Sequence, residues 1–234
     1  MRIKVLGTRG EVEPSLPYHS KHSGVLVDNQ IMLDLGEREY LDYRPACIFI
    51  THLHPDHAFF VVEEAPGIEA PVYAPEEYGD KVGITVISGP VELGSHHVIP
   101  VPTHHSKRVK SAAYLVISGE HRLLYTGDLI WINKEYHNLL EDLDMVITDG
   151  SFIRRGGMVR KDRETGQLYG HNGIPDLVNL FKKFTRHILF VHFGAWFYEG
   201  VEMARQKLVE LGEANGVTVQ AGYDGMEIDL DHLK

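Results

Sequence analysis

Short apolar runs separated by Gly, Pro, Asn and Asp recur along the chain and predict a β-rich protein. The runs are rich in β-branched and aromatic residues, which is the pattern of strands rather than of helices. Asp28-Asn29, between two of these runs, supplies the chemistry of a hairpin turn. The predicted strands cover residues 2–7, 24–27, 31–35, 47–50, 71–74, 84–88, 97–101, 113–117, 122–126, 144–148, 187–191, 218–219 and 226–230.

Fewer segments show the spacing of a helix. Pro175 opens an amphipathic segment, because proline suits the first turn of a helix. Its apolar face consists of Leu177, Val178, Leu180, Phe181 and Phe184. Further helices are predicted over 58–64, 134–141 and 199–212, whereas residues 152–172 have the composition of a long loop with little core. Loops of this length are usually functional or disordered.

Composition narrows the class of protein. A length of 234 residues without a repeat or linker predicts one domain over residues 1–234. The single cysteine, Cys47, excludes an intrachain disulfide and fits a cytoplasmic protein. No apolar run approaches the roughly 20 residues that cross a bilayer, so no membrane span is expected. The net charge of -10 argues against nucleic-acid binding by the whole surface.

The sequence THLHPDH follows one predicted strand directly and concentrates metal-binding side chains. Side chains alternate along an extended segment, so His52 and His54 point the same way and can share one ion. Pro55 ends the strand, and the turn after it can bring Asp56 and His57 toward a second ion. A polar strand end with clustered histidines is the alternative, but three His and one Asp within six positions favour a metal site.

Metal-capable side chains also follow other predicted strands. These are His104 or His105, then Asp128, and finally His192. A single strand-end His or Asp is usually a solvated residue, but together these supply ligands for two metals, with Asp128 as a bridge. Asp34, at another strand end, would cap that strand or orient a ligand.

The HxHxDH motif, the later His-Ser, the Gly-Asp and the final strand-end His resemble the metallo-β-lactamase superfamily. The segments Leu6-Gly7-Thr8, Asp34-Leu35-Gly36 and Asp224-Gly225-Met226 are similar to that family as well. The resemblance implies an α/β protein with a four-layer αββα sandwich and a site along one edge of its two sheets. It also implies a hydrolase.

The resemblance further implies two divalent ions, with zinc expected first and manganese or iron as alternatives. The expected ligands are His52, His54 and His105 for the first ion, Asp56, His57 and His192 for the second, and Asp128 between them. His105 is favoured over His104 because the family has His followed by Ser or Thr, although His104 stays open. Asp56 is also expected to orient the attacking water.

A second resemblance bears on the substrate. Asp149-Gly150-Ser151 and the later Gly170-His171-Asn172 are similar to the tRNase Z and related phosphodiesterase branch. In that branch an acidic residue supports a histidine that protonates the leaving oxygen, which would make Asp149 and His171 catalytic. The alternative is that His171 merely precedes a helix.

The arginine-rich loop suggests a phosphate-binding rim. Arg154 and Arg155, together with Lys107 beside the third histidine ligand, are expected to bind a phosphodiester. A charge-balanced, solvated loop is the alternative. The expected function is therefore a phosphodiesterase for a nucleotide or small nucleic-acid substrate, because the acidic charge and the lack of a long Gly/Pro-rich insertion argue against a large RNA. A lactonase or other acyl-ester hydrolase with an apolar pocket is the rival hypothesis.

The aromatic string from Phe193 to Tyr198 allows three interpretations. It could form a wall of the substrate pocket, part of the core, or an interface between subunits, and the core interpretation is favoured. The oligomeric state therefore stays open, with a dimer among the options.

Overall fold

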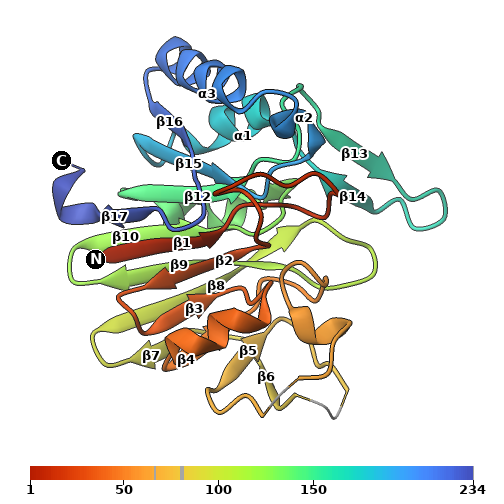
Figure 1. Cartoon of the computed structure of the whole chain (residues 1–234), viewed down its shortest axis with the longest axis vertical. Coiled ribbons are helices and arrows are strands. Elements are labelled where there is room, and N and C mark those ends of the chain that lie inside the picture. Colours follow the sequence, from red (N-terminus) through yellow and green to blue (C-terminus); the bar gives the residue numbers. More distant parts are fainter. Residues whose placement is uncertain (66, 80–81, 234) are drawn as a thin grey trace.

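Two mixed β-sheets carry most of the regular structure, as the many short apolar runs predict. The computed structural model describes residues 1–65, 67–79 and 82–233 (Figure 1). In spatial order, the first sheet contains β17 (Glu227–Asp229), β1 (Arg2–Gly7), β2 (Gly24–Val27), β3 (Ile31–Leu33), β4 (Cys47–Phe49), β5 (Val72–Ala74) and β6 (Ile84–Val86). The second contains β11 (Trp131–Ile132), β8 (His96–His104), β9 (Ala112–Ser118), β10 (His121–Tyr125), β12 (Met145–Asp149), β15 (His187–Val191) and β16 (Thr218–Ala221), with β7 (Val91–Leu93) also paired to β8.

Strand direction places several strand ends at the same edge. In the first sheet β3 and β4 are parallel. In the second, β10, β12 and β15 are parallel, and β8 runs in the same direction because both β8 and β10 are antiparallel to β9. The loops after these strands therefore emerge together, and they contain the polar residues that the sequence singled out.

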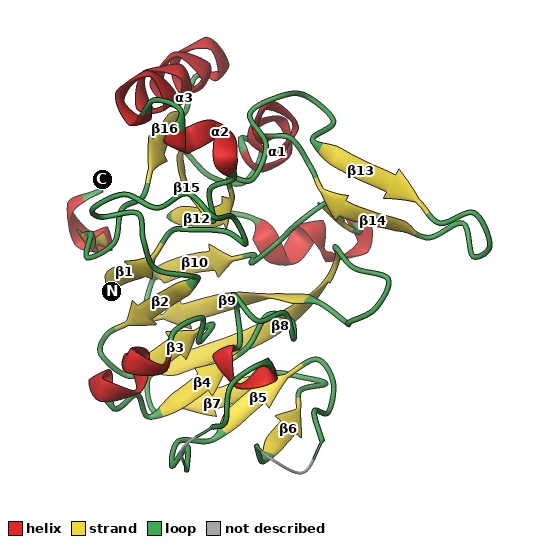
Figure 2. Ribbon diagram, turned by 45° about the vertical axis from the view of Figure 1, so that its right-hand side comes forward, coloured by secondary structure: helices red, strands yellow, loops and turns green. Residues whose placement is uncertain are grey.

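Three apolar clusters separate four layers. One cluster lies between the two sheets. A second packs the eight-stranded sheet under α1 (Ile174–Phe181), α2 (Ala195–Tyr198) and α3 (Val201–Asn215), which lie together at one side of the molecule (Figure 2). The third covers the other sheet beneath the 3-10 helices η1 (Arg38–Tyr43) and η2 (Phe59–Val61). The predicted αββα sandwich is confirmed, with short 3-10 helices as one outer layer.

None of the described helices combines the length and the apolar character that a bilayer-spanning segment needs. The remaining helices in the described part of the chain are the 3-10 helices η3 (Lys134–Leu140) and η4 (Leu230–His232). Two predicted helices, over 58–64 and 134–141, are thus 3-10 turns in the structure. Both segments are short, and a short segment gains little from the cooperative hydrogen bonding of an α-helix.

The prediction of a loop over residues 152–172 is wrong for the middle of this segment. The segment contains a β-hairpin of β13 (Met158–Lys161) and β14 (Leu168–His171), which projects from the sandwich (Figures 1 and 2). None of the hairpin residues is buried, so the sequence shows no apolar alternation there. Gly170 is required at the pairing, because a Cβ on it would lie 1.9 Å from the Met158 carbonyl oxygen. Backbone pairing holds this hairpin together.

Candidate metal centre

The strand ends bring seven potential ligands together. His52, His54, Asp56 and His57 follow β4, while His105 follows β8, Asp128 follows β10, and His192 follows β15. All seven are buried except His54, which is half-buried. The sequence placed them on separate elements, and the structure assembles them around the Asp128 carboxylate.

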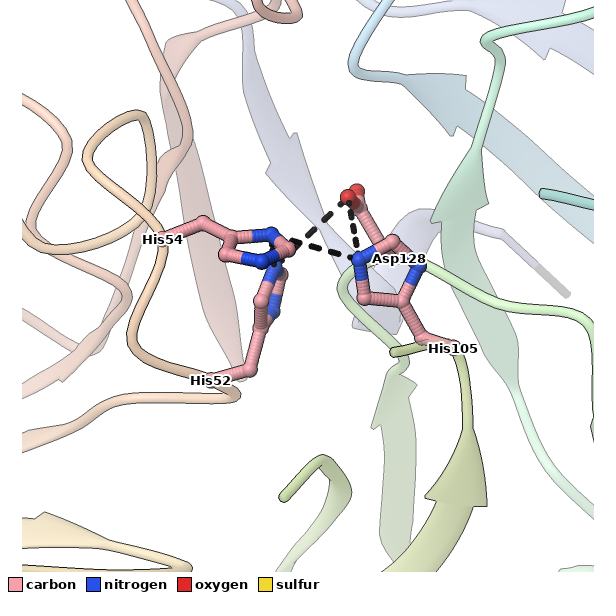
Figure 3. Close-up of side chains that lie close together, drawn as sticks. All are labelled: His52, His54, His105 and Asp128. Atoms are coloured by element: carbon pink, nitrogen blue, oxygen red, sulfur yellow. Dashed lines mark hydrogen bonds and ion pairs between the residues drawn. The ribbon is translucent and has the colours of Figure 1, made fainter. Parts of the chain in front are cut away.

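The first group comprises His52, His54, His105 and Asp128, whose potential ligand atoms lie within 4.8 Å of one another. Figure 3 shows the two residues of the β4 loop facing the other two. His54 Nδ1 lies 3.0 Å from His52 Nε2 and 3.3 Å from His105 Nε2. Asp128 Oδ2 lies 3.6 Å and 3.4 Å from the same two Nε2 atoms.

These separations fit a tetrahedral metal site. Zinc–nitrogen bonds of 2.0–2.1 Å require ligand atoms about 3.3 Å apart in a tetrahedron. The structure also distinguishes His105 from the adjacent His104 as the potential ligand. His104 lies outside the group, because its Nε2 contacts Asn133 Oδ1 at 3.0 Å and its ring stacks on Trp131 at 4.4 Å between ring centroids.

The second group comprises Asp56, His57 and His192. His192 Nε2 lies 2.8 Å from Asp56 Oδ2. Asp128 Oδ1 lies 3.2 Å from both His57 Nε2 and His192 Nδ1, yet this buried oxygen has no hydrogen-bond partner among the described residues. A buried carboxylate oxygen without a hydrogen bond is costly unless a cation compensates it, so this oxygen fits a second ion.

Asp34 holds the ligand His57 in place. Its carboxylate accepts hydrogen bonds from His57 Nδ1 at 2.6 Å, from the backbone N–H of Thr51 at 2.7 Å and from the Tyr125 hydroxyl at 2.8 Å. A carboxylate that binds the outer nitrogen of a ligating histidine fixes its ring and tautomer. Asp34 therefore acts as the orienting residue that the sequence suggested.

Excess negative charge dominates the electrostatics of the centre. Burial lowers the pKa of His57, but the carboxylates of Asp128, Asp34 and Asp56 outweigh it and raise that pKa to about 10. At His105 the effect of burial is the larger one, and it lowers the pKa to about 4 although the Asp128 carboxylate raises it. The carboxylates around His57 thus give this part of the centre a negative charge that attracts cations.

Asp149, Ser151 and His171 adjoin the second group. Asp149 Oδ2 lies 2.7 Å from His171 Nδ1, and the Ser151 hydroxyl donates to Asp149 Oδ1 at 2.5 Å. Ser151 Oγ also lies 2.9 Å from His192 Nδ1. The role of Ser151 was missed from the sequence, although its position two residues after a strand-end acid was a usable signal. Asp128, Asp149, His171 and His192 form a further potential ligand group within 4.8 Å.

Two residues of the centre have an unusual backbone conformation. Asp34 and His192 adopt left-handed backbone conformations, with φ of 61° and 55°. Such conformations are unfavourable for side chains other than glycine and often mark functional sites. The strain at His192 turns the chain directly after β15 and leaves its ring beside Gly10, where a Cβ would lie 3.0 Å from the imidazole.

A cavity of about 650 Å³ opens above the centre. Apart from the ligands, its walls are largely apolar and include Val12, Phe152, Met158, Ala195 and Trp196. Phe193 and Phe197 are fully buried and stacked, so the aromatic string serves the core, while Trp196 serves the cavity wall. No local sequence pattern pointed to Val12 or Met158, which come from distant segments.

The expected basic rim does not line this cavity. Arg154 Nε donates to the Gly157 carbonyl at 3.1 Å, and Arg155 lies 3.7 Å from Asp176. Lys107 pairs with Asp162 at 2.7 Å. No Arg or Lys occurs among the described residues of the cavity lining. Local partners on the exposed surface draw these side chains away from the centre.

Most of the chain matches a known protein family. Residues 37–193 match the model of the β-lactamase superfamily domain, which is more than half of the chain. The chain belongs to the metallo-β-lactamase superfamily. It is a hydrolase of that superfamily, whose members bind divalent metals, and it has His and Asp groups that could hold such ions.

Solved structures share this metallo-β-lactamase fold at low sequence identity. The metallo-β-lactamase fold protein YhfI from Bacillus subtilis is 17% identical with a TM-score of 0.71, covering 97% of this chain and 98% of its own. A diphosphatase of the PhnP family is 17% identical (TM-score 0.66, 97% of each chain). The short form of human tRNase Z is 18% identical (TM-score 0.61, 98% and 99%). No curated protein sequence matches the chain significantly.

Proposed function

We propose that this protein is a binuclear metal-dependent phosphodiesterase acting on a nucleotide or small nucleic-acid phosphodiester. The observation that carries the proposal is the Asp149–His171 pair beside the two ligand groups. Two proteins of similar fold, the PhnP-family diphosphatase and human tRNase Z, have names that denote phosphate-bond chemistry.

The ligand groups described above fit two divalent ions. Zinc agrees with the imidazole-rich first group, and manganese or iron would also accept the carboxylates. When bound, such a pair supplies Lewis acidity and a hydroxide nucleophile at neutral pH. Asp56, in the second group, would orient the attacking water.

His171 is the proposed proton donor for the leaving oxygen. Its Nδ1 is engaged by Asp149 at 2.7 Å, and its side chain lines the cavity. Nε2 has no hydrogen-bond partner among the described residues and is therefore the nitrogen that can face a leaving group. Geometry of this kind suits a general acid, because the buried carboxylate holds the ring in one orientation.

The cavity walls favour a substrate with one negative charge and a planar group. A phosphodiester is a monoanion, so the two ions can neutralise it without additional cations. Phe152 and Trp196 offer aromatic surfaces against which a base can pack. Glu11, also in the lining, would repel further phosphates. Inside this cavity, these features support one diester group rather than several phosphates.

The test compares leaving groups in protein reconstituted separately with zinc and manganese. Bis(p-nitrophenyl) phosphate releases a stable phenolate that needs little protonation, whereas a dinucleotide releases an alkoxide that needs an acid. His171→Ala is expected to keep two ions per chain, to lose about 10²–10⁴-fold in kcat on the dinucleotide, and to lose far less on the phenolate ester. Equal losses on both substrates would remove His171 as the acid.

An acyl-ester hydrolase is the second candidate, and the lack of described Arg or Lys residues in the cavity lining favours it. The same reconstituted protein is therefore assayed on lactones, thioesters and phosphomonoesters. Turnover of a lactone far above that of every phosphodiester would contradict the phosphodiesterase proposal. Failure on all diesters, in protein holding two ions per chain, would do so as well.

A further inference from the structure

A second cavity, of about 670 Å³, lies beside the loop that connects β8 and β9. In Figure 1 this loop runs between the β13–β14 hairpin and strands β5 and β6. The neighbours His104 and His105 face different cavities. His105 belongs to the first ligand group and lines the cavity above the metal centre, called the catalytic cavity below, whereas His104 lines the second cavity. The two cavities therefore flank the same strand end.

The charge of the second cavity is opposite to that of the chain. Lys107, Arg108 and Lys110 line it within four consecutive positions, although the whole chain has a net charge of -10. All three side chains are exposed. Lys107 is paired with Asp162, but Arg108 and Lys110 have no ion pair among the described residues. At least two cations are therefore available to a ligand.

The only acidic residue among the described lining is already engaged. Glu76 Oε1 accepts the backbone N–H of Lys110 at 3.0 Å, which fixes the loop rather than neutralising a side chain. Ser106 Oγ accepts the backbone N–H of Arg108 at 3.1 Å, closing a turn that presents the cations. Ser111 and Gln167 add further hydrogen-bonding groups to the lining.

The lining thus combines what a phosphate group needs. Arginine offers a planar pair of donors that matches phosphate oxygens, and lysine adds a mobile point charge. A turn held by two hydrogen bonds to the backbone limits the freedom that a ligand would otherwise have to remove. The catalytic cavity has neither of these cations, so the two cavities differ in the chemistry that they recognise.

We infer that the cavity lined by Arg108 and Lys110 binds the phosphate group of an anionic ligand, separately from the metal centre. Two kinds of ligand could supply this phosphate group. One is a further phosphate along the substrate chain, which rests on the proposed phosphodiesterase function. The other is an independent small phosphate compound. Binding itself does not depend on the reaction at the metals.

The first measurement is a titration of the metal-loaded protein with inorganic phosphate, followed by NMR of the backbone amides. Shifts are expected at residues 106–111, distinct from those at 194–196 in the catalytic cavity. The double variant Arg108→Gln/Lys110→Gln should weaken the response of 106–111 about tenfold or more, because hydrogen bonds to charged groups are lost. Its response at 194–196 should persist.

The matched control is Lys183→Gln/Lys207→Gln, which removes two exposed positive charges from other parts of the surface. This variant should bind phosphate at 106–111 like the unaltered protein. An equal loss in the control would mean that the net charge of the protein, and not this cavity, governs binding, which overturns the inference. No phosphate response at 106–111 in the unaltered protein overturns it as well.

Kinetics then distinguish the two sources. If the ligand is a distal phosphate of the substrate, the double variant should raise KM for a 5′-phosphorylated tetranucleotide about tenfold and leave KM for bis(p-nitrophenyl) phosphate unchanged. Unchanged KM for both, with phosphate binding still lost, assigns the site to an independent ligand. Phosphate binding at 106–111 without turnover of any diester would refute the proposed function while supporting this site.

Discussion

Replacing Asp34 with Asn tests whether the buried carboxylate controls the second ion. Asp34 accepts from His57, Tyr125 and two groups of Thr51, so it satisfies four donors. In Asn one carboxylate oxygen becomes an NH₂ group, which cannot accept, and either orientation leaves one or two of these donors unpaired. The φ of 61° is no obstacle, because Asn tolerates the left-handed region.

The magnitude follows from these contacts. Each buried donor left without an acceptor costs about 1–3 kcal/mol, so one or two unpaired donors should lower the free energy of unfolding by roughly 1–6 kcal/mol. His57 also loses the carboxylate that orients it, which typically weakens metal binding 10–100-fold. The loss should fall on the ion held by His57, while the ion held by the first group keeps its affinity.

The assay measures metal content and dissociation constants in zinc buffers, together with urea unfolding. Asp28→Asn is the matched control, since Asp28 also has a positive φ of 48° and its carboxylate lies 2.8 Å from His96 Nε2, but away from the ligand groups. It should lose some stability and keep both ions. Unchanged affinity for both ions in Asp34→Asn would refute the orienting role.

Three further predictions concern the centre and its surroundings. Asp128→Ala should lose both ions and all activity, because its two oxygens face both ligand groups; retention of two tightly bound ions by metal analysis would contradict this. His105→Ala should lose one ion while His104→Ala keeps two, and the reverse result would exchange their roles. Burial lowers the pKa of His19 to about 4, so the folded protein resists protonating it. The free energy of unfolding should therefore fall as pH decreases from about 6.5 toward 4, by up to about 3 kcal/mol, and His19→Asn should flatten that part of a pH series of urea unfolding curves.

The sequence by itself predicted the elements with strong local signals. The strands β4, β10 and β15, which precede six of the seven ligands, are largely buried, so their apolar runs stand out, and the metal-capable residue directly after each run is visible without a structure. Asp128 and His192 were found in this way. The local pattern marked these residues one by one, and the pairing of parallel strands within each sheet is what brings them to one edge.

Only the tertiary structure decided which side chains share the cavity. Backbone pairing forms the β13–β14 hairpin with little apolar burial, so composition suggested a loop. Exposed cations such as Arg155 and Lys107 are placed by surface partners that lie far away in the sequence, and these partners turn them from the centre. The cavity walls likewise come from segments as distant as Val12 and Trp196. A metal-binding side chain can be recognised from the residues next to it in the sequence. The walls of a substrate cavity depend on packing between distant segments, which no local pattern records.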